Sequence, residues 1–275
     1  MNDRMNRTIR VLLGYFLLCC AATTVSAALF GRTGGSGNGN SKIALRKRLH
    51  VNTLITEPGT MEVDWSNLYS LSTSNFTMPS GIRYTPGGSS IIWGRTVYGV
   101  AFDSISSANI GASRLTQFGQ AVTLSATSVI HDGEKFDFAI APQAIVFLRD
   151  ESGLRLGAVA IARYDTGRNS IGGTVSWSAA THNSPSNPAG IFDVGFGFGH
   201  QLSGSQLLER FTPHVNAEWE RSTGLPRALL ASEGVEYQIT GRLAFDVSGQ
   251  QITGAGNPSD HQIAFGITLS LGQLH

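Results

Sequence analysis

The chain has 275 residues, of which 14% are charged and 33 are glycine, and its formal net charge is +1. Soluble domains average about 25% charged residues and about 7% glycine, so this chain is poor in charge and rich in glycine. A net charge near zero gives no reason to expect nucleic acid as a partner. The composition disfavours coiled coils, helical bundles and multispan helical membrane proteins, and it favours strands built from small residues.

Residues 1–27 are expected to form a secretory signal peptide. Three arginines precede an apolar run at 11–24, and the small residues at 25–27 suit cleavage after Ala27. The run is shorter than the ~20 residues that a spanning helix needs. Both cysteines, Cys19 and Cys20, lie in this segment. The mature chain therefore lacks cysteine, which excludes disulfides and thiolate metal sites.

Residues 28–58 are expected to form a flexible N-terminal segment. Residues 28–41 are rich in Gly, Ser and Asn, a composition typical of linkers. Residues 42–50 (KIALRKRLH) are basic, and we interpret them as a solvated stretch that leads into the folded domain. A specific anionic partner for this stretch is the alternative. The folded domain is then expected at residues 59–275.

From residue 59 onward, apolar and polar residues alternate with a period of two, which predicts β-strands. The last segment is the clearest, because Phe265 and Ile267 fall on one face while Gly266 and Thr268 fall on the other. We predict about twelve strands, many of them longer than the five or six residues usual in soluble sheets. Their predicted spans are 60–70, 76–85, 91–103, 117–129, 135–148, 153–164, 169–180, 189–201, 209–220, 231–240, 242–252 and 261–272.

The predicted connections alternate between short and long. Short turns are expected at 85–88, 132–134, 165–168 and 240–242, and long loops at 104–115, 181–189, 221–232 and 252–260. Short turns on one side and long loops on the other are typical of transmembrane β-barrels, as are strands near ten residues. In lipid every backbone polar group must be paired, so such a sheet must close.

The sequence therefore predicts an all-β fold, a transmembrane antiparallel β-barrel of the outer membrane. Its expected partners are outer-membrane lipid, the barrel-assembly machinery and a small-molecule solute, with no nucleic acid. A secreted soluble β-sandwich stays open as an alternative, because alternation alone does not say whether the apolar face points outward or inward.

Residues 57–63 (EPGTMEV) and 236–247 (EYQITGRLAFDV), the latter followed by a loop and a final alternating strand, carry a resemblance. They resemble the outer-membrane proteins of the meta-pathway phenol-degradation family, a group described as transporters, over most of the mature chain. The resemblance implies a barrel that passes small solutes, among which the family name suggests aromatic or apolar compounds. Outer-membrane barrels usually end in an aromatic residue, whereas this chain ends in Leu274-His275.

Charged residues on the face opposite the apolar stripe are the candidate functional residues. Both signs occur, so they form either an internal network that fills a narrow barrel or the lining of a water path. A twelve-stranded barrel is wider than an eight-stranded one, whose side chains nearly fill the interior, so a small channel is feasible. The predicted lumen-lining residues are Arg95, Asp103, Asp137, Arg155, Arg163, Asp193, Glu218, Glu236 and Asp246.

The His182-Asn183-Ser184 sequence is similar to the His-x-Ser pair of barrel lipid hydrolases, in which the imidazole activates the hydroxyl. Pro185 follows, and residues 181–188 have the composition of a loop, so we predict no catalytic residue and no enzyme. The histidines lack the spacing of metal sites, and most are expected at strand ends or in loops; we expect no cofactor and no metal.

Our leading functional prediction is an outer-membrane channel or transporter for small solutes. A structural or adhesive surface barrel with a plugged lumen is the first alternative. A lipid hydrolase that uses His182 and Ser184 and a secreted soluble β-sandwich remain as further alternatives.

Overall fold

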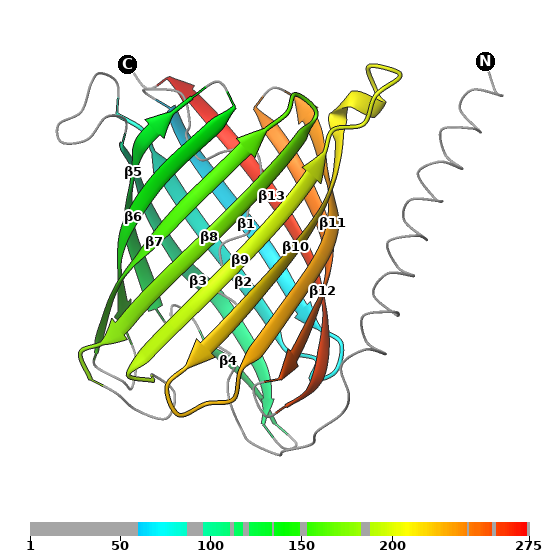
Figure 1. Cartoon of the computed structure of the whole chain (residues 1–275). Helices are drawn as coiled ribbons and strands as arrows, with labels where there is room; N and C mark the ends of the chain where they lie inside the picture. Colours follow the sequence, from blue (N-terminus) through cyan, green and yellow to red (C-terminus); the bar gives the residue numbers. More distant parts are fainter. Residues whose placement is uncertain are drawn as a thin grey trace.

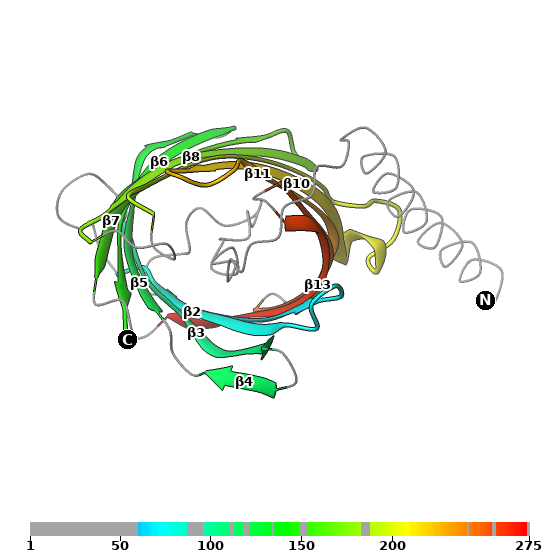
Figure 2. The ribbon, with the colours of Figure 1, turned by 90° about the horizontal axis from the view of Figure 1, so that it is seen from below.

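The computed structural model describes residues 60–86, 96–110, 113–117, 121–133, 135–148, 153–182, 188–240, 242–254 and 257–273. Within them, twelve long antiparallel strands follow one another around a closed ring (Figures 1 and 2). The pairing of β1 with both β2 and β13 closes the ring. The predicted all-β antiparallel barrel of about twelve strands is confirmed. The predicted signal peptide and N-terminal segment lie outside the described residues.

The strands of the ring have between 9 and 17 residues, enough for a tilted crossing of a bilayer. No described segment forms a helix of the length and hydropathy needed to cross a membrane. The elements are β1 (Thr60–Ser70), β2 (Phe76–Tyr84), β3 (Thr96–Ile110), β4 (Ser113–Gln117), β5 (Ala121–Asp132), β6 (Phe136–Phe147), β7 (Leu154–Asp165), β8 (Asn169–Ala180), β9 (Gly190–His200), the 3-10 turn η2 (Leu208–Arg210), β10 (Phe211–Ser222), β11 (Ala228–Thr240), β12 (Leu243–Gly254) and β13 (Asn257–Gln273).

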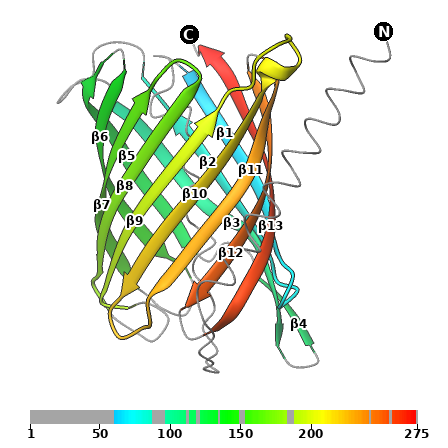
Figure 3. The same cartoon turned by 45° about the vertical axis from the view of Figure 1, so that its right-hand side comes forward.

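The start of the first barrel strand and the end of the last one lie at the same rim, because Thr60 at the start of β1 pairs with Gln273 at the end of β13. We call this the terminal rim and the opposite one the far rim. Antiparallel neighbours then place the β7–β8 and β11–β12 turns at the terminal rim and the β8–β9 and β10–β11 connections at the far rim (Figures 1 and 3).

The region of β3 and β4 differs from the sequence prediction. We expected a long loop at 104–115, but β3 continues to Ile110 and turns back into β4, which pairs with the end of β3. The start of β3 pairs with β5, so β4 is a short extension beyond the ring at the far rim (Figure 3). Residues 100–110 contain neither Gly nor Pro, so nothing in them ends the strand.

The predicted contrast between short turns and long loops is wrong in part. The loops expected at 221–232 and 252–260 are short, because the strands on both sides extend into them. At the β12 end, Gly254 has φ +88°, and a Cβ there would lie 2.1 Å from the carbonyl oxygen of Arg227, so this tight turn requires glycine. A longer connection, 201–210, lies at the terminal rim, where the sequence predicts an unusually long turn at 201–208 as an exception to the short ones.

The apolar stripe of each strand lies on the outer face of the ring. On β13, five apolar side chains at alternate positions 263–271 are 36–43% exposed, while Gln262, Ala264 and Gly266 between them are buried. In a soluble sandwich the apolar faces would instead meet in the core. An apolar outer face with fully paired strands is the arrangement that lipid requires. The predicted facing of Phe265 and Ile267 is confirmed.

Exposed aromatic side chains lie near both rims of the outer face. Tyr84 and Tyr164 lie near the terminal rim, and Tyr69 and Trp177 near the far rim, with exposures of 36–58%. Trp65 is also exposed on the outer face but lies at mid-strand in β1. Amphipathic rings favour the two membrane–water interfaces, so the two levels mark the limits of an apolar belt.

Candidate functional site

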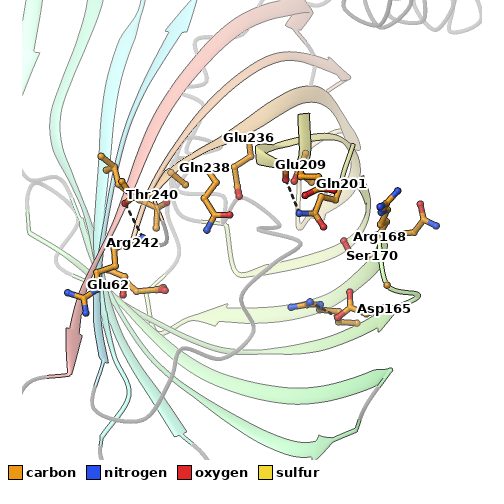
Figure 4. Close-up of a pocket in the computed structure, with 18 of the residues that line it drawn as sticks. Glu62, Asp165, Arg168, Ser170, Gln201, Glu209, Glu236, Gln238, Thr240 and Arg242 are labelled. Carbon is orange, nitrogen blue, oxygen red and sulfur yellow. Dashed lines mark hydrogen bonds and ion pairs between the residues drawn. The ribbon is translucent and has the colours of Figure 1, made fainter. Parts of the chain in front are cut away.

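A cavity of about 640 Å³ opens inside the barrel at the terminal rim (Figure 4). Strand ends from β1, β7, β8 and β10–β13 surround it, because the ring brings distant segments to the same rim. Apart from Leu243 and Ala244, its lining is polar, charged or glycine. The charged lining residues are Glu62, Lys135, Arg163, Asp165, Arg168, Glu209, Glu236 and Arg242. Such a lining suits water and hydrophilic solutes.

Ion pairs order the walls of this cavity. On β7, Arg163 pairs with Asp165, two residues away on the same face. On the β1–β2 side, Arg83 of β2 holds two carboxylates, with its Nη2 atom 2.9 Å from Glu62 Oε2 and 3.1 Å from Asp64 Oδ2. Pairing of this kind lowers the free-energy cost of placing charges beside a low-dielectric wall.

Deeper in the lumen, His214 of β10 forms a network with residues of the next two strands. Its Nε2 atom lies 2.7 Å from Asp246 Oδ2 on β12, and its Nδ1 atom lies 3.3 Å from Asn216 Nδ2. The Asn216 amide also donates to Ser232 Oγ on β11 at 3.2 Å. Since the amide donates to Nδ1, this geometry places the imidazole proton on Nε2, from which it is donated to Asp246. We expected most histidines at strand ends or in loops, and His214 is one that lies inside a strand, β10.

Gly234 makes this network possible. It lies on β11 directly between His214 on β10 and Ser248 on β12. A Cβ at position 234 would lie 2.8 Å from His214 Cε1 and 2.6 Å from Ser248 Cβ. The imidazole can therefore cross β11 to reach Asp246 only because residue 234 has no side chain.

A second polar cluster lies at the far rim. Arg155 of β7 is 3% exposed and donates through Nη1 to Ser178 Oγ at 3.2 Å and through Nη2 to the carbonyl oxygen of Pro188. Asp193 lies close enough for its charge to act on Arg155, and it accepts a hydrogen bond from Ser176 Oγ at 2.8 Å. The cluster ties β7, β8 and the start of β9 together, which is a structural role.

Some inward positions of β3 and β5–β7 are small, apolar and closed to solvent, and we call these positions the packed half. Half-buried polar residues such as Thr127, Gln143 and Arg163 also face inward on the same strands. Side chains of the packed half are directly opposite one another in the ladders, as Ala141 is to Val159. Six of them are at most 6% exposed, namely Val97, Ala121, Val129, Ala139, Ala141 and Val159.

The inner face of β9–β13 and β1 is different, and we call it the acidic half. Carboxylates lie opposite one another in its ladders, as Glu220 is to Asp193 and Glu236 is to Asp246. Its inward carboxylates are Glu62, Asp64, Asp193, Glu218, Glu220, Glu236, Asp246 and Asp260. Glu62 and Asp246 are buried and the others are half-buried. In a closed ring, the surface that an inward side chain exposes faces the lumen, so these half-buried carboxylates border the lumen.

The structure places the predicted lumen-lining residues in different surroundings. Arg163 and Glu236 line the terminal cavity, and Glu218 lies on β10 opposite Gly195 of β9. Asp137 of β6 is directly opposite Arg163 of β7. Arg155, Asp193 and Asp246 belong to the two networks above.

Two predicted residues cannot be compared. Arg95 lies outside the described residues, and of Asp103 only the backbone is described, opposite Pro79 in the β2–β3 ladder. Sequence reasoning missed Arg83, His214 and Asn216 as functional candidates. The signal was present, because His214, Asn216 and Glu218 follow one another at every second position of β10 and therefore share a face.

The alternative hydrolase site is not assembled among the described residues. His182 is exposed at the end of β8, and Ser184 lies outside the described part of the chain. Likewise, the described residues contain no group of three His, Cys, Asp or Glu side chains placed to hold a metal ion.

Comparisons with known proteins agree with the fold. A structure of the NanC porin matches with a TM-score of 0.53 and 10% identity over 75% of this chain and 98% of that one. The KdgM porin matches with a TM-score of 0.51 and 8% identity over 76% and 98%. No protein-family model and no curated protein sequence match the chain. The fold is thus that of outer-membrane porin-like β-barrels, whereas membership of the meta-pathway phenol-degradation family is not confirmed.

Proposed function

We propose that this protein is an outer-membrane channel for small solutes and performs no covalent chemistry. The observation that carries the proposal is the polar cavity at the terminal rim. Half-buried polar residues along β10 and β11 extend the same polar character further into the barrel. The apolar outer belt favours contact with outer-membrane lipid. We therefore expect the barrel-assembly machinery to be the partner that inserts the chain into the membrane. The porin-like fold supports the same class of function.

The chemistry of the lining favours hydrophilic solutes. Our sequence analysis suggested aromatic or apolar compounds through the family resemblance. An apolar solute gains free energy from apolar surface, and the terminal cavity offers little of it beyond Leu243 and Ala244. Charged and hydroxyl side chains instead replace part of the hydration shell of a polar solute.

Planar-bilayer conductance of the refolded chain tests this proposal directly. We expect discrete conductance steps, and we expect Gln238→Trp to reduce them because Gln238 lines the terminal cavity. Ile239→Trp is the matched control, since Ile239 is the next residue of β11, is 41% exposed and faces outward. A folded, inserted protein without conductance would contradict the proposal.

A second candidate function is a structural or adhesive barrel with a plugged lumen. It is favoured by the packed half, where Ala139 and Ala141 have no exposed surface although they lie on the inner face. Folded protein that binds surfaces or cells but passes neither ions nor sugars in liposome-swelling assays would support this candidate.

A further inference from the structure

We propose that the terminal cavity binds the anionic groups of small polar acids through Lys135, Arg168 and Arg242. This inference rests on the proposed channel function and adds the class of solute that the cavity accepts. It follows from three turns of the terminal rim, each of which places a basic side chain at the edge of the cavity.

Basic residues stand directly before five of the strands that run away from the terminal rim. Lys135 precedes β6, Arg168 precedes β8, and Arg242 precedes β12. The sequence has Arg95 and Arg210 in the same place before β3 and β10. The chain therefore repeats one basic residue per turn at this rim, although the turns differ in length and in the rest of their sequence.

The backbone of the three cavity residues is held by the next strand of the ring. The carbonyl oxygens of Lys135, Arg168 and Arg242 each accept a backbone hydrogen bond, at 2.7 or 2.8 Å. The donors are the N–H groups of Asp165, Gln201 and Ser270, respectively. All three basic side chains are exposed and line the cavity, and Figure 4 shows Arg168 and Arg242 on opposite sides of it. An anionic group that enters the cavity thus meets a cation on more than one wall.

The formal charge of the lining does not by itself select a solute, because four basic and four acidic residues line the cavity. The charges differ in how far they are already engaged. Glu62 pairs with Arg83, and Asp165 pairs with Arg163. Glu236 has an interaction partner as well. Three of the four lining carboxylates therefore already have partners in the folded chain.

The three basic side chains at the turns are in the opposite situation. Within the described part of the chain, the side chains of Lys135, Arg168 and Arg242 have no hydrogen-bond or ion-pair partner, and of the lining carboxylates this holds for Glu209 alone. Hydrogen bonds from charged donors to carboxylate or phosphate are about twice as strong as those between neutral groups. The guanidinium fork also matches the geometry of both anions. This surplus of charged donors favours a solute that supplies anionic acceptors.

The rest of the cavity suits the uncharged part of a small polar acid. Its volume of about 640 Å³ lies in the range of small-molecule sites. Amide and hydroxyl side chains line it between the charged residues, among them Gln201, Gln238 and Ser270. These groups both donate and accept hydrogen bonds, so they can bind the hydroxyl groups of a solute whose acid group contacts the cations.

Isothermal titration calorimetry of the full refolded chain in an uncharged detergent tests this inference without using conductance. Citrate, a tricarboxylate, is the anionic probe, and sorbitol is the uncharged one. We expect citrate to bind more tightly than sorbitol. Arg242→Gln should weaken citrate binding by about two- to fivefold, the loss typical of one exposed ion pair. The triple variant Lys135→Gln, Arg168→Gln, Arg242→Gln should weaken it by about tenfold or more.

Arg227→Gln is the matched control. Arg227 is also exposed and stands directly before a strand, β11, but it lies at the far rim. Citrate binding should therefore stay at the wild-type value, and an equal loss in this variant would overturn the assignment to the terminal cavity. Arg242→Lys keeps the positive charge and should retain more affinity than Arg242→Gln. Equal losses in these two variants would show that charge does not carry the binding and would overturn the inference.

Two outcomes separate this inference from the channel function. Conductance from a chain that binds citrate no better than sorbitol would overturn the anion site and leave the channel intact. Citrate binding by a folded, inserted chain that does not conduct would overturn the channel and leave the anion site intact.

The phosphates of lipid headgroups are another source of the same chemistry, since the turns lie at a rim of the barrel. In phosphatidylcholine nanodiscs at physiological salt, replacing part of the lipid by phosphatidylglycerol should leave citrate affinity unchanged. Competition by phosphatidylglycerol would assign the three cations to lipid headgroups and overturn the assignment to solutes.

Discussion

The two halves of the inner face are made of the same kind of strand but have opposite character. In the packed half, Ala139, Ala141 and Val159 interleave with apolar outward residues, so β6 and β7 are nearly apolar on both faces at mid-height. In the acidic half, inward positions of β10 such as Asn216 and Glu218 alternate strictly with apolar outward ones such as Val215.

The difference indicates that the lumen is not uniform around its axis. Six small apolar side chains of the packed half are at most 6% exposed, whereas Asn216, Glu218 and Glu236 of β10 and β11 are half-buried. A solute path along one side of the barrel needs polar groups on that side alone. The other side can use small apolar residues to hold the wall rigid and dry. The four predictions below test this division, from the largest expected effect to the smallest.

Ala139→Arg should be the most damaging of the changes we consider. Ala139 has no exposed surface, so the guanidinium would be buried without a partner, which costs about 3–5 kcal/mol. Ser232→Arg is the matched change in the acidic half and should cost less than about 1 kcal/mol, because Ser232 is half-buried on the inner face between Asn216 and Gln250 and borders the lumen. Urea unfolding in detergent, followed by tryptophan fluorescence, measures both. Equal costs would show that the two halves do not differ.

The pair Ile267→Arg and Thr268→Arg compares the outer face of β13 with its inner face, which belongs to the acidic half. Ile267 is 36% exposed on the outer face, and an arginine in lipid should cost about 2–4 kcal/mol near the midplane. Thr268→Arg should cost much less, since Thr268 faces inward and its hydroxyl donates to Asp64 Oδ1 at 3.0 Å. Heat-modifiable gel mobility reports the folded fraction of each variant. A larger loss for Thr268→Arg would mean that this strand is inside out.

His214→Ala probes the network that distinguishes the acidic half. Asp246 loses a hydrogen-bond donor in a buried position, which should lower the free energy of unfolding by about 1–3 kcal/mol. His200→Ala is the control, because His200 contacts Asn169 at the terminal rim and should cost less than about 1 kcal/mol. A similar cost for both variants would show that the His214–Asp246 contact contributes nothing of its own.

Single cysteines should distinguish the halves with almost no effect on stability. A membrane-impermeant thiol reagent should label Thr268→Cys, because this position faces the terminal cavity. It should not label Ala141→Cys in the packed half or Ile267→Cys on the outer face. The Cys19 and Cys20 positions lie in the expected signal peptide and would not interfere after cleavage. Rapid labelling at 141 would mean that the lumen is open across its whole width.

Sequence alone was sufficient for the features that depend on one strand. The period-two pattern predicted the strands of the ring and which residues of the last one face outward, because side chains alternate across a strand whatever its neighbours are. The same alternation placed Glu218 and Glu236 on the face opposite the apolar stripe. Three connections escaped this reasoning, namely those after β3, between β10 and β11 and between β12 and β13, because pairing with a neighbour can extend a strand into polar sequence that has no clear alternation.

Tertiary structure decided how the strands combine. That His214 meets Asp246, 32 residues away, depends on the order and register of β10, β11 and β12 and on the missing side chain of Gly234. That carboxylates gather on one half of the lumen depends on which strands are neighbours in the ring. Alternation within a strand is local. Register, closure and the electrostatic field inside the lumen depend on residues that are far apart in the chain, so only the closed barrel determines them.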